Sequence, residues 1–176
     1  MSHAARIRLA DVKDAAAIAR VHVDTWRTTY VGIVSDEHLA NLSYARSEQR
    51  QREKMSSGSG FAYVAEIEPG QVVGFAFGGP ERENDSIYHG ELYGLYILKD
   101  YQRQGIGRQL VRAIVQRLQE AEFTNMLIWV LAKNPACGFY AALGGKAIRE
   151  KIVSIGGKEL REIGYGWDNL ASLLVD

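Results

Sequence analysis

The segment from Leu95 to Leu110 (LYILKDYQRQGIGRQL) constrains the fold of this chain more than any other stretch. An apolar run typical of a buried strand passes into a polar loop with glycines at positions 105 and 107, and a helical pattern begins at once. At a helix N-terminus the first N–H groups have no partner within the helix, and the helix dipole adds positive potential. Glycine allows the backbone there to approach a ligand closely. The segment therefore predicts a strand–loop–helix unit that binds an anion such as a phosphate group.

Strands and helices alternate on both sides of this segment. Strands are expected at residues 6–10, 61–67, 72–77, 87–98, 126–131, 147–155 and 160–167, and helices at 11–30, 35–42, 43–55, 106–120 and 134–144. The sequences Glu68-Pro69-Gly70-Gln71 and Gly156-Gly157 are typical of turns and join neighbouring strands into hairpins. This order predicts a single α/β (α+β) domain over residues 1–176, with a mixed, largely antiparallel sheet of about seven strands flanked by helices.

Composition and charge exclude several classes of function. Lys plus Arg and Asp plus Glu both total 21, so the net charge is zero and binding of nucleic acid through bulk positive charge is not expected. The single cysteine excludes an intramolecular disulfide, and the four histidines lack paired ligand spacing, so we expect no metal site. The sequence has no apolar run of about 18 residues and no apolar signal segment, so we expect a cytoplasmic protein with no membrane partner.

Three kinds of phosphate-binding loop compete for the segment that contains the two glycines. A P-loop needs Gly-Lys-Ser/Thr, which the chain lacks, and a dinucleotide-binding fingerprint needs a third glycine where Leu110 stands. The segment from Gln102 to Gly107 (QRQGIG) instead resembles the Q/R-x-x-G-x-G/A signature of the GCN5-related N-acetyltransferase (GNAT) superfamily, whose members hold the pyrophosphate of acetyl-CoA with this loop. The alternative is a helix that carries two glycines near its N-terminus without such a role.

Further motifs extend the resemblance over residues 60–150. Family members carry an acidic residue and an L-Y-V-like run on the strand before the loop, then Asn, a Phe-Tyr pair and Gly further along. The matching residues here are Glu91, Leu95-Tyr96-Ile97, Asn134, Phe139-Tyr140 and Gly144. The chain departs from the family pattern by having Lys99-Asp100 where Pro is common, Arg103 where Gly is common, and Gly145 where Phe is common. The resemblance implies a sheet that splays between its fourth and fifth strands.

The resemblance also implies an activity, that of an acetyl-CoA-dependent N-acetyltransferase. The acetyl group would move directly to a primary amine of a small molecule or peptide in a ternary complex, with acetyl-CoA as the acyl donor and no metal. A homodimer is compatible with the family. Two alternatives stay open: transfer to a hydroxyl or of a longer acyl group on the same fold, and an acyl-CoA-binding sensor with weak catalysis or none.

The family's motifs assign the donor site to two stretches of backbone and a few side chains. The strand before the loop would bond the pantetheine arm as an added strand, the loop amides would hold the pyrophosphate, and Asn134 would bond the donor near its thiol end. The implied donor-binding residues are Leu95, Tyr96, Ile97, Gln102, Arg103, Gln104, Gly105, Ile106, Gly107, Arg108, Asn134 and Tyr140.

Amide formation needs a base, because a protonated amine is not a nucleophile, and an acid for the departing thiolate. Glu91 lies in a strand rich in Tyr and Leu, where partial burial would suit a base; the alternative is an exposed Glu paired with a surface cation. Tyr140 is the implied general acid, and its alternative is an aromatic core residue. Trp26 and Tyr30 are candidates for an aromatic acceptor pocket, or for packing along one helix face. Cys137 is interpreted as a small packing residue and not as an acyl carrier.

Overall fold

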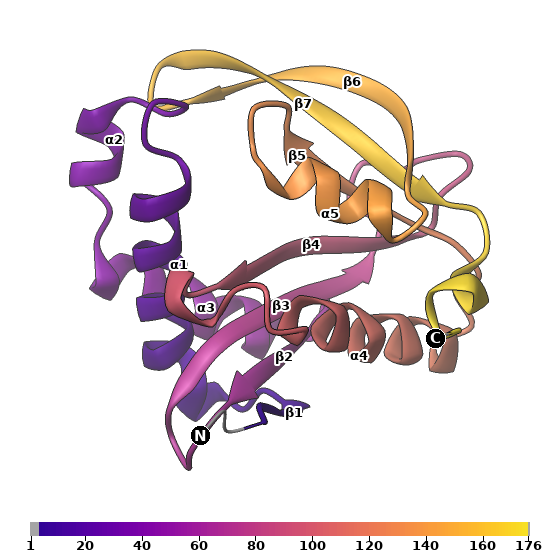
Figure 1. Cartoon of the computed structure of the whole chain (residues 1–176), viewed down its shortest axis with the longest axis horizontal. Helices are drawn as coiled ribbons and strands as arrows, with labels where there is room; N and C mark the ends of the chain where they lie inside the picture. The colour runs from indigo at the N-terminus through magenta and orange to yellow at the C-terminus, as the bar shows by residue number, and fades with distance from the viewer. Residues whose placement is uncertain (1–3, 176) are drawn as a thin grey trace.

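One mixed sheet of seven strands forms the centre of the computed structural model, which describes residues 4–175 (Figure 1). The strands are β1 (Arg6–Leu9), β2 (Phe61–Glu66), β3 (Val72–Pro80), β4 (Gly90–Ile97), β5 (Met126–Leu131), β6 (Lys146–Ile155) and β7 (Lys158–Trp167). Their spatial order is β1-β2-β3-β4-β5-β7-β6, and every neighbouring pair is antiparallel except β4 and β5, which are parallel. The predicted mixed and largely antiparallel sheet of about seven strands is confirmed.

Helices cover both faces of this sheet. The α-helices are α1 (Ala15–Thr29), α2 (Asp36–Ala40), α3 (Tyr44–Ser57), α4 (Ile106–Glu120) and α5 (Ala136–Ala142), and short 3-10 helices occupy Val12–Asp14, Lys99–Tyr101 and Leu170–Leu173. The α1 helix buries Ile18 in a cluster with Phe75 of β3, whereas α4 buries Leu110 in a cluster with Ala76 of the same strand. Since adjacent residues of a strand point to opposite faces, α1 and α4 lie on opposite faces of the sheet (Figure 1).

Side-chain caps and a glycine set the ends of the smaller helices. Ser35 Oγ accepts the N–H of the third residue of α2, and Ser43 Oγ does the same for α3, both at 3.3 Å. The α3 helix ends at Gly58, whose φ of 67° is the left-handed conformation that glycine adopts readily. Among residues 4–175 no helix combines the length and apolar character needed to cross a membrane.

The β4 and β5 strands separate soon after they meet. They share two residue pairs, the second being Glu91 with Leu127, whereas β4 stays paired with β3 up to Ile97. Tyr93 is an extra residue in β4 that forms a β-bulge against β3, and a bulge bends its strand and increases the local twist. Beyond Glu91, the edge of β4 that faces β5 has no described strand beside it. The predicted splay between the fourth and fifth strands is confirmed.

Two strand ends differ from the prediction by three residues, and the others agree to within two. The β4 strand begins at Gly90 and not at residue 87, because Asp85 Oδ1 accepts the backbone N–H groups of Ile87 and Tyr88 at 2.8 and 2.9 Å. Those donors are then unavailable to the sheet, and residues 81–89 form a loop. The β3 strand extends instead to Pro80, three residues beyond its predicted end.

Candidate active site

The loop after β4 leads from the splayed edge into helix α4. Within it, Gln102 Nε2 donates to the carbonyl of Ile97 at 2.9 Å, and Gln104 Nε2 donates to the carbonyl of Asp100 at 3.0 Å. The first helical hydrogen bond of α4 runs from the N–H of Gln109 to the carbonyl of Gly105 at 3.2 Å. The amides of residues 106–108 therefore have no acceptor within the helix, and the exposed loop can hold an anion there.

Two glycines in this loop act for different physical reasons. Gly105 has a φ of 82° in the left-handed region and stands at the N-cap of α4, where open space surrounds it. At Gly107 the constraint is space, since a Cβ would lie 3.2 Å from the Phe139 ring and 3.4 Å from Ile97 Cδ1. Arg103 also adopts a left-handed φ of 62°, a region that glycine enters readily and other residues rarely do. In the glycine loop (residues 102–107), Arg103 and Gly105 therefore set the backbone conformation, and Gly107 allows close packing against Phe139.

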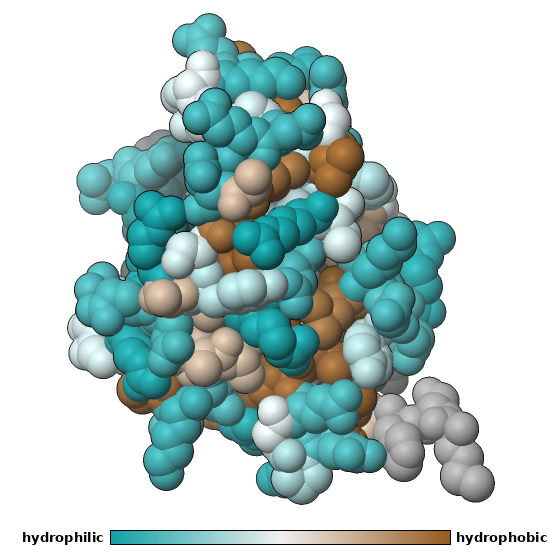
Figure 2. All heavy atoms as spheres, turned by 90° about the vertical axis from the view of Figure 1, so that its left-hand side faces the viewer, coloured by the Kyte–Doolittle hydropathy of each residue, from teal (hydrophilic) through white to brown (hydrophobic). Residues whose placement is uncertain are grey.

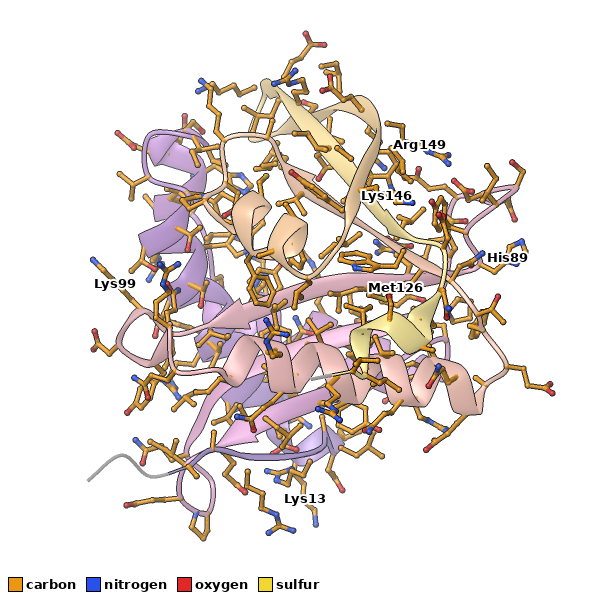
Figure 3. All side chains as sticks on the ribbon, turned by 45° about the vertical axis from the view of Figure 1, so that its right-hand side comes forward. Lys13, His89, Lys99, Met126, Lys146 and Arg149 are labelled. Atoms are coloured by element: carbon orange, nitrogen blue, oxygen red, sulfur yellow. The ribbon has the colours of Figure 1, made fainter. Side chains whose placement is uncertain are left out.

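A cavity of about 130 Å³ lies where β4 and β5 separate. Its walls come from α1, β4, β5, the start of α5, the end of β6 and β7, which are far apart in the sequence. Figure 3 labels His89 and Lys99 just beyond the two ends of β4, and Met126 at the start of β5, where the two strands meet before they part. On the face that carries α1 and α2, apolar surface is visible between the polar side chains (Figure 2).

The cavity brings together predicted residues from both ends of the chain. Those that line it are Trp26, Tyr30, Leu95, Tyr96, Asn134 and Tyr140. Residue Ile97 and the glycine loop continue along the same edge of β4 outside the cavity wall. Predicted donor-binding and acceptor-binding residues therefore meet at one place, and Glu91 and Ile97 are the predicted site residues of β4 that do not line it.

Tyr30 and Asn134 are in direct contact although 104 positions separate them. Asn134 Nδ2 donates to the Tyr30 hydroxyl at 3.1 Å, and Asn134 Oδ1 accepts the N–H of Ala136 at 2.9 Å at the start of α5. The Tyr30 ring lies 4.4 Å from the Trp26 ring, centroid to centroid. Burial raises the pKa of the Tyr30 phenol, so the group is a neutral hydroxyl at physiological pH. Helix α1 and the start of α5 are thus held together across the cavity.

Tyr140 extends from α5 into the cavity and is 3% exposed. Its ring packs near Tyr165 and Trp167 of β7, with centroids 6.3 and 6.4 Å away. Burial raises the pKa of the Tyr140 phenol, and the neighbouring phenols of Tyr96 and Tyr30 raise it further. The hydroxyl therefore keeps its proton at physiological pH and can donate it.

Glu91 lies at the last paired position between β4 and β5, and only 2% of it is exposed. Its carboxylate accepts three hydrogen bonds from Arg82, from Nη2 at 2.6 Å, from Nε at 3.1 Å and from the backbone N–H at 3.2 Å. The Arg82 guanidinium lies 4.2 Å from the centre of the Tyr93 ring at the bulge. The structure thus places Glu91 in a buried pair with a half-exposed cation, where one alternative from the sequence was an exposed pair.

Three residues around the cavity were not predicted from the sequence. Glu162 and Trp129 line it from β7 and β5, and the register that pairs Leu131 with Glu162 places this carboxylate beside the end of β5. His22 of α1 lies behind the wall, with its ring 5.1 Å from Tyr96. Burial lowers the pKa of His22 to about 4, and the nearby cations of α3 lower it further. No local motif marks these residues, because strand register and helix packing bring them to the site.

Known proteins resemble the chain in both sequence and structure. Residues 17–144 match the acetyltransferase (GNAT) family. The uncharacterized N-acetyltransferase YuaI of Bacillus subtilis is 40% identical over 166 residues, which are 94% of this chain and 92% of YuaI. An N-acetyltransferase from Staphylococcus aureus has a TM-score of 0.74 at 19% identity, covering 94% of this chain and 98% of the other. The yncA protein of Salmonella typhimurium, solved with its cofactor acetyl-CoA, has a TM-score of 0.70 at 22% identity, with 94% of each chain covered.

Proposed function

This chain belongs to the acetyltransferase (GNAT) family and is an acyltransferase, and we propose that it transfers an acetyl group from acetyl-CoA to a primary amine of a small molecule or peptide. One observation carries this proposal: the unpaired edge of β4 runs from the glycine loop directly to a cavity that is lined by the buried Tyr140. A donor with a phosphate at one end and a thioester at the other needs such a path.

The single cysteine is a free thiol, which is compatible with a reducing compartment such as the cytoplasm.

The residues present fit acetyl-CoA as the donor. Backbone groups of Leu95, Tyr96 and Ile97 on the free edge of β4 would bond the pantetheine arm as an added strand. Amides of the glycine loop and of Arg108 would hold the pyrophosphate, with the Arg103 and Arg108 side chains adding positive charge. Bound in this way, acetyl-CoA would supply the acetyl group as an activated thioester. Asn134 is hydrogen-bonded to Tyr30 and to the N–H of Ala136, so it would lie at the cavity end of that path.

Tyr140 would act as the general acid. The phenol reaches the cavity, its raised pKa keeps it protonated, and its proton would pass to the thiolate as the carbon–sulfur bond breaks. The amide nitrogen gives up a proton in the same turnover, so the phenolate left behind can be reprotonated without an external acid.

Glu91 would act as the base through a water molecule. An ionised carboxylate offers about four acceptor positions, and Arg82 uses three of them, so one is left for water. In Glu91→Gln, we expect kcat/KM to fall about tenfold or more near pH 7 and less at pH 9, where more of the amine is already neutral. The measurement is a pH profile, with acetyl-CoA affinity as the control for folding. An unchanged profile would remove Glu91 from the mechanism.

Direct transfer is supported by the position of Cys137. Its Sγ lies 3.5 Å from the Leu131 carbonyl and 3.9 Å from the Ala132 carbonyl, so the thiol contacts the backbone at the end of β5. A Cys137→Ala variant that keeps its activity would agree with transfer in a ternary complex without an acyl-enzyme.

The experiment that tests the function combines donor binding with turnover. Acetyl-CoA should raise the thermal midpoint of the protein and bind in calorimetry, and free thiol should appear when a panel of primary amines is added. Mass spectrometry of the products should show one acetyl group on the amine. Binding without thiol release on any amine would favour the sensor alternative, and release with alcohols alone would favour O-acyl transfer.

A further inference from the structure

One carboxylate on the cavity wall is only loosely paired. Glu162 of β7 is 18% exposed in its side chain, and its nearest cation is Lys151 Nζ at 4.0 Å, beyond hydrogen-bond distance. No described residue donates a hydrogen bond to this carboxylate. The two neighbouring carboxylates differ, because Glu91 accepts three hydrogen bonds from Arg82 and Glu83 accepts one from Lys151 at 2.5 Å. Glu162 is therefore the carboxylate at this cavity whose acceptor positions are open.

The wall around Glu162 already holds one ammonium group. Lys151 Nζ lies 4.0 Å from the centre of the Trp129 ring, which is a cation–π contact, and the same group bridges Glu83 and Glu162. The Trp26, Tyr30 and Tyr96 rings complete the aromatic lining. An indole face beside a carboxylate is chemistry that binds an ammonium ion, and Lys151 is the cation with which an acceptor nitrogen would compete there.

The local charges also favour a cation. The charged groups that act on Glu162 are Arg82 and Lys151, which are positive, and Glu83 and Glu91, which are negative, so together with Glu162 itself one negative charge is unbalanced. Burial raises the pKa of the Glu162 carboxyl, and Lys151 partly opposes that rise. A bound cation would stabilise the ionised form that burial disfavours.

We propose, on the basis of the acetyltransferase function above, that Glu162 and Trp129 bind a positively charged nitrogen of the acceptor, and that the acceptors are small aliphatic amines and diamines. Amino acids are disfavoured, because their carboxylate would face Glu162. A cavity of about 130 Å³ accommodates a chain of a few carbons. Glu162 is thus a specificity-determining residue, separate from the groups that move protons.

The test compares 1,4-diaminobutane with 4-aminobutanoate, which have the same length and differ at one end in charge. The wild-type protein should use the diamine with a kcat/KM at least about 30-fold higher. Glu162→Gln should raise the KM for the diamine about tenfold or more, change kcat less, and leave acetyl-CoA affinity within twofold. Lys151→Met should lower that KM, since it removes a competing cation. Glu159→Gln, an exposed glutamate on the same strand, is the matched control and should change nothing.

Amine binding is also measured directly, by calorimetry on the protein loaded with CoA. This separates the two proposals, because a failure of transfer with intact diamine binding contradicts the transferase and leaves Glu162 supported. The inference is overturned if Glu162→Gln binds the diamine within twofold of wild type, if wild type binds no cationic amine, or if 4-aminobutanoate is the better acceptor.

Discussion

The two sides of the splay are built from different parts of the chain. On the proposed donor side, the groups assigned to donor binding are mainly backbone groups of β4 and the glycine loop, which come from one continuous segment, residues 95–108. On the acceptor side they are aromatic and charged side chains from α1, β5 and β7. Tyr140 of α5 lies where the two sides meet. A backbone site binds a group common to all family members, whereas a side-chain site can change its specificity by single substitutions.

This difference predicts that substitutions on the two sides have different effects on binding and transfer. Substitutions on the donor side should act through backbone conformation and reduce acetyl-CoA affinity whatever the amine. Substitutions and pH changes on the acceptor side should act through charge and leave the donor affinity intact. A substitution at the junction should stop transfer while both sides still bind.

The largest effect is expected at the junction. Tyr140→Phe keeps the ring contacts with Tyr165 and Trp167 and removes the proton donor, so kcat should fall about 100-fold while the acetyl-CoA Kd stays within threefold. Steady-state kinetics and calorimetry measure the two quantities. Tyr63→Phe on β2, away from the cavity, is the control. A kcat within threefold of wild type would show that Tyr140 is a packing residue.

A smaller effect is expected from His22, which supports the acceptor side behind Tyr96. Its pKa is about 4 in the folded chain and ~6.5 when unfolded, so between these values the unfolded chain binds more protons. The free energy of unfolding should therefore fall as the pH falls from 6.5 towards 4. At pH 5 His22 should account for a loss of about 2 kcal/mol.

The measurement is the free energy of unfolding in urea at pH 7 and pH 5. His22→Gln cannot gain this proton, so its loss of stability between the two pH values should be smaller than that of wild type by about 2 kcal/mol. Equal losses of unfolding free energy in the two proteins would show that folding does not lower the pKa of His22.

The donor and acceptor sides also differ in what the sequence reveals. The order of strands and helices along the chain follows from local patterns, because period, turn residues and the glycine spacing are properties of short segments. The splay was implied by the family resemblance and not by any local pattern. The same patterns extended β4 to residue 87, since an apolar sequence does not show that Asp85 takes the backbone donors there. Local chemistry between side chain and backbone overrides the hydrophobic pattern at such ends.

For the site, the sequence indicated one partner of each contact but not the contact itself. Trp26 and Asn134 were candidates for different roles, and the packing of α1 on the sheet brings both to one cavity. Glu162 had no distinguishing signal, because its place depends on the pairing of β7 with β5. The roles of Glu91, Tyr140 and the donor-binding residues stay predictions that the variants above test.

The smallest effect separates the donor side from general stability. Gly105 and Gly58 both have left-handed φ values, 82° and 67°, and at both a Cβ would meet almost open space, so alanine should cost about 1 kcal/mol of stability at either position. Gly58 ends α3, whereas Gly105 is the N-cap of α4, beside the loop amides that we propose hold the donor phosphate. Gly105→Ala should therefore weaken acetyl-CoA binding about tenfold in calorimetry, and Gly58→Ala should leave it within twofold. If both variants lose stability equally and neither loses affinity, the donor phosphate does not depend on the conformation of this loop, and the contrast between a backbone-built side and a side-chain-built side fails.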